Sequence, residues 1–207
     1  MKKRKNILEM KKYIIFAHQS PGGGIGRRAG LKHQFLPWSA GSTPAPGTPS
    51  AWRVFYNIIV MNVISQEKQR QYDKHYLEMA VIWSKNSYCK RRMVGALLVK
   101  DKMIISDGFN GTPEGFENEC EDENNVTKTY VLHAEANAIT KVAKSSNNSL
   151  GATLYVTTSP CIECSKLIIQ AGIKRVVYLY QYHNTEGLSL LKRANIEVIK
   201  FSADEGI

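Results

Sequence analysis

The sequence predicts an α/β protein, a three-layer α/β/α sandwich with a mixed sheet of about five strands. Two observations support this expectation. After Met61, four stretches carry apolar residues at helical three- and four-residue spacing, and they alternate with short, nearly continuous apolar runs typical of strands covered on both faces. In addition, the 207 residues are 43% hydrophobic, which suffices for one domain with a full core and an appended segment.

The expected elements follow one another closely along the chain. The first helix covers residues 65–87, where aromatic and aliphatic side chains share one face. Residues 93–111 contain two apolar strands around Lys100-Asp101-Lys102, which predicts a hairpin. The remaining expected elements are a helix over 133–146, a strand over 152–159, a helix over 160–172, a strand over 174–181, a helix over 185–195 and a strand over 196–201.

The N-terminal part differs in composition from the rest. Residues 20–50 are rich in Gly, Pro, Ser and Thr and lack a helical or strand period, so disorder is the default. We therefore expect a disordered basic extension over residues 1–60 and a folded domain over residues 61–207. The extension holds ten Lys/Arg against one acidic residue, and the rest holds eighteen against seventeen. Of the net charge of +10, +9 thus belongs to the extension and +1 to the rest, and the near-neutral domain argues against a nucleic-acid partner.

The extension also suggests a hypothesis about the gene. Back-translated, "GSTP" matches the T-loop sequence of a transfer-RNA gene, and "GGIGRRAGLK" resembles the start of a leucine tRNA gene. Residues 1–60 would then be read-through from a mis-assigned start, with Met61 as the true initiator. The alternative is a translated disordered tail. No apolar run is long enough to cross a bilayer, and we expect a cytoplasmic protein with no membrane partner.

Two short motifs point to a catalytic zinc site. "HAE" places His133 two residues before Glu135, and "PCIEC" places Cys161 and Cys164 on one helical turn after Pro160. Catalytic zinc takes three protein ligands and keeps a fourth position for water or substrate, and one histidine with two cysteines supplies that set. The glutamate is then a general base beside the metal-activated water.

The structural alternative is a zinc knuckle, or an unligated core in which the cysteines are small buried side chains. The joint pattern H-x-E followed by P-C-x-x-C is typical of nucleobase deaminases and favours the catalytic interpretation. Intact Glu135 points the same way, because a structural zinc needs no general base.

The chain resembles the zinc-dependent cytidine deaminase superfamily, and within it the deoxycytidylate (dCMP) deaminases, over residues 65–201. The subfamily resemblance rests on "CKRRMVGALLVKD", "GFNGTPEGF" and "GIKRVVYLYQYHN". It implies a cytidine deaminase-like fold and hydrolytic deamination of dCMP to dUMP and ammonia, supplying dUMP for thymidylate synthesis. In that reaction the zinc-activated water attacks C4 of cytosine while Glu135 protonates N3 and then the departing amine.

The resemblance also suggests substrate contacts. Asn110 is expected at the base or sugar, although an Asn-Gly turn is the simpler interpretation. Arg91 or Arg92 is expected at the 5′-phosphate or in an effector site, although paired arginines are often only solvated surface. Tyr182 maps to a substrate-contacting tyrosine, although it could be an exposed sheet residue. Ser159 is expected to present backbone groups near the metal.

Two further expectations come from the resemblance. Some relatives carry a second, structural zinc, and Cys89 and Cys120 resemble two of its ligands. Glu119, Glu121 or a water could complete such a site, but no further Cys or His precedes His133, so we expect buried free thiols. Family members are typically oligomers, often hexamers, regulated by dCTP and dTTP, which predicts a homo-oligomer with a nucleotide substrate. The competing functions are deamination of another base, such as tRNA adenosine, cytosine or free cytidine, and a non-catalytic zinc-binding module.

Overall fold

The computed structural model describes residues 50–202, and the chain divides into two compact units between Gln69 and Arg70. The described part of the first unit is helical and belongs to α2, Ser50–Ser84. Residues 50–60 thus differ from the predicted disorder, because the Gly- and Pro-rich composition stops there and residues 51–60 contain neither Gly nor Pro. Residues 1–49 lie outside the described residues, and the domain division at residue 60 stays a prediction.

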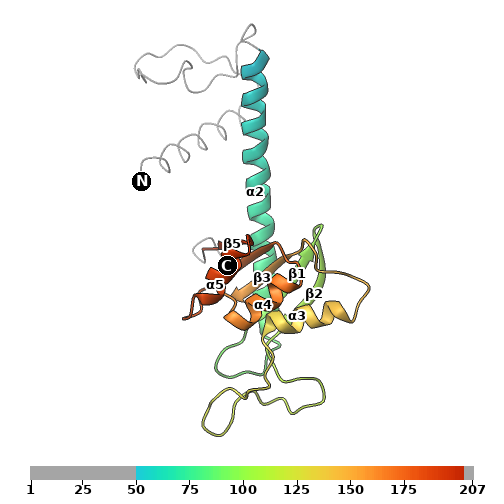
Figure 1. Ribbon diagram of the computed structural model, residues 1–207, viewed down its shortest axis with the longest axis vertical. Coiled ribbons are helices and arrows are strands. Elements are labelled where there is room, and N and C mark those ends of the chain that lie inside the picture. The colour runs from blue at the N-terminus through green and yellow to red at the C-terminus, as the bar shows by residue number, and fades with distance from the viewer. Residues whose placement is uncertain (1–49, 203–207) are drawn as a thin grey trace. The chain divides into compact units, whose positions relative to one another are not determined.

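The second unit is built around a five-stranded mixed sheet with strand order β2-β1-β3-β4-β5 (Figure 1). The pairs β1/β2 and β1/β3 are antiparallel, and β3/β4 and β4/β5 are parallel. The predicted fold class is therefore confirmed. The elements are β1 Gly95–Lys100, β2 Met103–Phe109, α3 Ala134–Ala143, β3 Thr153–Thr158, α4 Ile162–Gln170, β4 Arg175–Tyr180, α5 Glu186–Arg193 and β5 Glu197–Lys200.

Helices cover both faces of the sheet, and each face has its own hydrophobic cluster. On one face, residues 70–84 of α2 pack Leu77 and Ala80 against Tyr155 and Val177 of the central strands. On the other face, α3, α4 and α5 cover the sheet. Because successive strand residues point to opposite faces, β3 serves both clusters. The larger cluster includes Leu98, Ala134, Ala138, Leu154, Val156, Ile168, Val176, Leu188 and Leu191.

A buried ion pair fixes α2 to the central strands. Asp73, with 4% of its surface exposed, accepts two hydrogen bonds from the Arg175 guanidinium at 2.8 and 2.7 Å. The Tyr155 hydroxyl donates a further hydrogen bond to the same carboxylate at 2.8 Å. The bidentate geometry satisfies the buried charges, so these contacts set the position of this part of α2 on the sheet.

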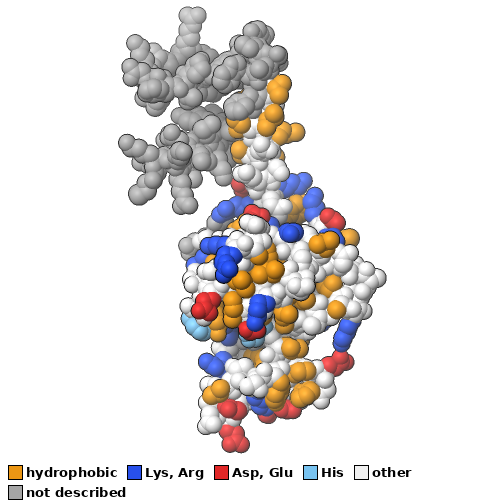
Figure 2. All heavy atoms as spheres, viewed as in Figure 1, with side chains coloured by type: hydrophobic (Ala, Val, Ile, Leu, Met, Phe, Trp, Pro, Cys, Tyr) orange, Lys and Arg blue, Asp and Glu red, His pale blue; other side chains and the backbone are white. Residues whose placement is uncertain are grey.

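The hairpin tip lies where the sequence predicts it. Asp101 and Lys102 both have positive φ, 50° and 64°. A two-residue hairpin turn of type I′ requires positive φ at both positions, and its twist matches that of the flanking strands. The face shown in Figure 2 carries Lys/Arg and Asp/Glu side chains interspersed over the second unit. Among the described residues, no helix combines the length and apolarity needed to span a membrane.

Candidate active site

The start of α3 positions the first two candidate catalytic side chains. His133 is the N-cap residue, with extended backbone, and Glu135 lies in the first turn. Reciprocal backbone hydrogen bonds of 3.1 and 2.8 Å between Gly111 and Leu132 hold the chain just before His133. At Gly108 of β2, a Cβ atom would fall on the Ala134 carbonyl oxygen. Glycine therefore permits the close approach of β2 to the first turn of α3.

The start of α4 positions the two cysteines. Cys161 is the N-cap residue of α4, three residues after the end of β3 at Thr158, and its sulfur accepts a hydrogen bond from the Cys164 amide at 3.5 Å. The Ser165 hydroxyl donates to the Cys161 carbonyl at 2.8 Å and supports the same turn. The predicted placement of both sulfurs on one turn is thus found, with the helix beginning one residue after Cys161 rather than at Pro160.

Three potential metal ligands meet between these two helix starts. The Nδ1 atom of His133 lies 3.4 Å from the sulfur of Cys161 and 3.4 Å from that of Cys164. All three ligand atoms lie within 4.8 Å of one another. Ligands at about 2.1–2.3 Å from a tetrahedral zinc ion are separated by roughly 3.6 Å. One imidazole and two sulfurs at this spacing fit a catalytic zinc site, so these residues are positioned as zinc ligands.

The pKa values of the two thiols shift in opposite directions. A hydrogen bond from Cys164 lowers the pKa of Cys161 to about 3, and the helix start adds to this effect. The same hydrogen bond, together with burial, raises the pKa of Cys164. The hydrogen bond with Cys161 also raises the pKa of His133. Zinc binds the deprotonated form of cysteine, so a lowered pKa at Cys161 favours metal binding there.

Glu135 is buried beside this ligand set. Its exposed fraction is 4%, and burial raises the pKa of its carboxyl to about 7, from a usual value of 4.5. Hydrogen bonding with Cys164 links the carboxyl to the ligands. A carboxyl with a pKa near neutrality can both accept and donate a proton at physiological pH. The arrangement suits proton transfer next to a metal-activated water.

Three of the candidate substrate residues, Asn110, Ser159 and Tyr182, follow the ends of β2, β3 and β4, and each has a structural hydrogen bond. Asn110 accepts from the Val94 amide and donates to the Arg92 carbonyl, both at 2.8 Å. The Ser159 hydroxyl accepts from the Tyr182 amide at 2.8 Å, so Ser159 ties the end of β3 to the segment after β4. One N–H and one lone pair of the Asn110 amide are left over by these two bonds. Substrate contacts by these residues stay predictions.

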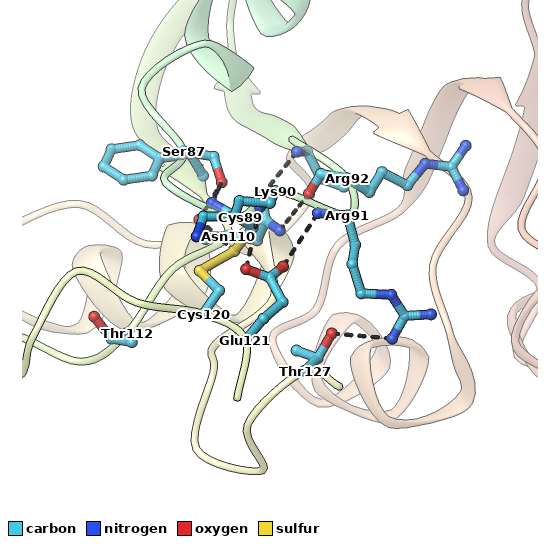
Figure 3. The surroundings of a disulfide bond; sticks show 12 residues. Ser87, Cys89, Lys90, Arg91, Arg92, Asn110, Thr112, Cys120, Glu121 and Thr127 are labelled. Carbon is cyan, nitrogen blue, oxygen red and sulfur yellow. Dashed lines mark hydrogen bonds between the residues drawn. A yellow bond between two sulfur atoms is a disulfide. The ribbon is translucent and has the colours of Figure 1, made fainter. Parts of the chain in front are cut away.

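The two arginines point in different directions (Figure 3). Arg91 donates to the Thr127 hydroxyl at 3.4 Å. Arg92 lines a cavity of about 250 Å³ and is the charged residue of its lining. That lining also includes Thr157 and Thr158, at the end of the strand that leads into Cys161; the full set is Val81, Ser84, Arg92, Met93, Thr157, Thr158 and Tyr180. The Arg91 side chain thus contacts Thr127, whereas the Arg92 side chain lines the cavity.

The prediction of free thiols at Cys89 and Cys120 is wrong, because the two residues form a disulfide. Their Cα atoms are 5.0 Å apart, within the range that a disulfide spans. The cysteines are 31 residues apart in the chain, so the sequence alone gave no sign that they meet. Both side chains are buried, at 4% and 1% exposure.

Sequence reasoning missed two residues that support the site. Asn137, one turn after His133, donates from its side chain to the Phe109 carbonyl at 3.0 Å and so holds β2 to α3. A polar side chain within the alanine-rich face of that helix was the available signal. Glu121 accepts hydrogen bonds from the backbone amides of Lys90 and Arg91, both at 3.2 Å. The sequence offered Glu121 only as a candidate ligand for a second zinc and gave no signal of this contact.

The sequence and the fold both match known proteins. Residues 70–180 match the family described as cytidine and deoxycytidylate deaminase zinc-binding region. The deoxycytidylate deaminase of Saccharomyces cerevisiae is 33% identical over 167 residues, covering 72% of this chain and 53% of the yeast protein. That of Schizosaccharomyces pombe is 34% identical over 148 residues, covering 65% of this chain and 45% of that protein. The chain thus spans about half the length of these two relatives.

A solved structure shares the fold of the second unit. The dCMP deaminase of cyanophage S-TIM5, in complex with dCMP and dUMP, has a TM-score of 0.61 and 46% sequence identity. The match covers 62% of this chain and 95% of the phage protein. The family match extends over more than half of the chain and includes His133, Glu135, Cys161 and Cys164. The chain therefore belongs to the cytidine and deoxycytidylate deaminase family and contains its zinc-binding region.

Proposed function

We propose that the chain catalyses the hydrolytic deamination of dCMP to dUMP and ammonia. The observation that carries this proposal is the meeting of His133, Cys161 and Cys164 beside the buried carboxyl of Glu135. Three ligands leave a fourth metal position for water, and the adjacent carboxyl can move protons. A purely structural zinc site would use four protein ligands and no such carboxyl.

The choice of dCMP rests on the relatives. The two yeast proteins are deoxycytidylate deaminases, and the phage structure holds dCMP and dUMP at 46% identity with this chain. The second unit also carries nearly balanced charge, which suits a small nucleotide better than a polyanionic tRNA. These points support a nucleotide substrate over the alternatives of tRNA adenosine, cytosine or free cytidine.

The mechanism assigns a proton-transfer role to Glu135. When bound, zinc supplies a water of lowered pKa next to the cytosine ring. Glu135 takes a proton from the attacking water, delivers it to ring N3, and then carries a proton to the departing amine. Its buried position keeps the proton within the site, and burial disfavours the charged carboxylate, which helps it to return the proton to the substrate.

Residues around the site would hold the rest of the nucleotide. Arg92 lines the cavity at the end of β3, which supports it as a contact for the 5′-phosphate, with Arg91 as the second candidate. Asn110 would contact the sugar or base through the amide groups left free by its structural bonds. Tyr182, held by Ser159, would flank the base from the segment after β4.

The wider biological setting is part of the same proposal. The product dUMP would supply thymidylate synthesis in the cytoplasm. We propose a homo-oligomer, with a hexamer as one possible assembly and dCTP and dTTP as effectors. Zinc is the resident metal, and neither nucleic acid nor membrane is proposed as a partner.

The direct test measures ammonia release and product formation from dCMP, dCTP, deoxycytidine, cytosine and a tRNA substrate, with zinc content determined on the same sample. We expect turnover of dCMP, its loss on chelation and its return with added zinc. Turnover of another substrate alone would assign a different deaminase, and bound zinc without any turnover would assign a binding module.

A further inference from the structure

A disulfide joins two segments next to the site. Cys89 precedes the two arginines, and Cys120 lies in the long connection between β2 and α3 (Figure 3). This connection, residues 110–133, contains only isolated bridges and no helix or strand. Connections of this length without regular structure are uncommon in compact domains, and covalent links restrict their conformations.

Glu121, the residue after Cys120, adds a second link between the same segments. One carboxylate oxygen accepts from the Lys90 amide and the other from the Arg91 amide, both at 3.2 Å. Glu121 and Thr127 also form an isolated antiparallel β-bridge. The Thr127 hydroxyl accepts a hydrogen bond from the Arg91 guanidinium. Hydrogen bonds to a charged acceptor are stronger than neutral ones, and two of them fix the direction of the backbone.

The linked segment is in turn connected to the metal ligands. The Ser87 hydroxyl donates to the Asn110 carbonyl at 2.7 Å, and the Asn110 side chain donates to the Arg92 carbonyl at 2.8 Å. Gly111, the next residue, pairs with Leu132, immediately before His133. The position of residues 90–92 relative to the metal site thus depends on contacts at both ends of the connection.

We propose that Glu121, held in place by the Cys89–Cys120 disulfide, is a positioning residue for residues 90–92. Glu121 and the disulfide, here called the loop clamp, keep the backbone of Arg91 and Arg92 in the geometry that receives the 5′-phosphate. This inference rests on the proposed function, because it assumes that one of these arginines binds phosphate. It predicts that the clamp acts on nucleotide binding and not on the chemical step.

The first experiment compares Glu121→Ala and Glu121→Gln with Glu123→Ala, an exposed glutamate in the same loop. For Glu121→Ala, we expect the KM for dCMP to rise about tenfold with kcat within about twofold. Glutamine keeps one acceptor oxygen, so Glu121→Gln should recover part of the loss. The kcat/KM for deoxycytidine, which lacks the phosphate, should change by less than about twofold. An equal loss with both substrates, or no change, would overturn the proposal.

A second measurement separates this proposal from the proposed function. Hydrogen exchange at the Lys90 and Arg91 amides reports the clamp whether or not dCMP is a substrate. We expect faster exchange at both amides in Glu121→Ala than in Glu123→Ala. Unchanged exchange would overturn the clamp, whereas failure of the wild-type protein to deaminate dCMP would overturn the proposed function alone.

The disulfide is tested by reduction with a phosphine. The phosphine and one water convert the disulfide to two thiols and become the phosphine oxide, so electrons and atoms balance. We expect reduction to raise the KM for dCMP, and the double variant Cys89→Ser, Cys120→Ser to show the raised KM without responding to the phosphine. Zinc should stay at one per chain. A second zinc after reduction, with KM unchanged, would show that the thiols bind metal and would overturn the role of the disulfide.

Discussion

At the scale of single residues, Glu135 is expected to act in catalysis without binding the metal. The carboxyl is buried next to the ligand set but supplies none of its three ligand atoms. Glu135→Gln should therefore retain one zinc per chain and lose at least about 100-fold in kcat, because the amide cannot accept the proton. Glu163→Gln, an exposed glutamate on α4, is the matched control. Near-normal turnover in Glu135→Gln would remove Glu135 from the mechanism.

The same residue makes the metal-free protein sensitive to pH. Burial raises the pKa of Glu135 from 4.5 to about 7, so between these values the unfolded chain has lost the proton and the folded chain still holds it. This group therefore lowers stability progressively as pH rises from 4.5 to 7, and the full penalty persists above 7. In the metal-free protein, Glu135→Gln should gain stability relative to wild type over that window.

Urea unfolding in the presence of chelator measures this difference. The gap in unfolding midpoint between Glu135→Gln and wild type should be smallest near pH 4.5 and reach a plateau above pH 7. A difference in unfolding midpoint that does not vary with pH would mean that ionisation of the Glu135 carboxyl does not cause the change in stability.

At the scale of elements, the contact between β2 and α3 sets the position of His133 and Glu135. A Cβ at Gly108 would overlap the Ala134 carbonyl, whereas one at Gly111 would meet only the Phe109 ring at 3.9 Å. Gly108→Ala should thus displace α3, lower stability by about 1–3 kcal/mol and reduce both zinc affinity and kcat. Gly111→Ala should change stability much less. Thermal unfolding and zinc titration of the two variants provide the comparison, and equal effects would contradict this explanation.

Local patterns predicted the elements well, because each depends on neighbouring residues. The spacing of apolar residues predicted every strand, and Lys100-Asp101-Lys102 predicted the hairpin turn between β1 and β2. The metal ligands were predictable because each helix start has its own motif. The Cys89–Cys120 disulfide and the Glu121 contacts depend on residues about 30 positions apart, and local patterns carry no information on such pairs. For the same reason, the tertiary contacts of Asn110 could not be predicted.

At the scale of the whole molecule, the contacts that hold the second unit together determine which part of the chain is needed. The buried hydrophobic residues among those described run from Leu77 to Phe201. Asp73 and Arg175 are 102 residues apart in sequence, and their bidentate contact anchors α2 on the sheet. Removing one partner of a buried ion pair costs about 3–5 kcal/mol, a large share of the stability of a typical domain.

These contacts predict opposite results for two deletions. A chain that begins at Met61 keeps Asp73 and the family-matching region, so its kcat/KM for dCMP should stay within about twofold of the full chain. A chain that lacks residues 1–74 loses Asp73, the buried partner of the Arg175 guanidinium, and keeps only the exposed partner Glu197, so its melting temperature should fall and its activity should be lost. Thermal unfolding and dCMP turnover of both deletions test this. Loss of dCMP turnover in a folded chain starting at Met61 would instead give residues 1–60 a part in the function and favour the binding-module alternative.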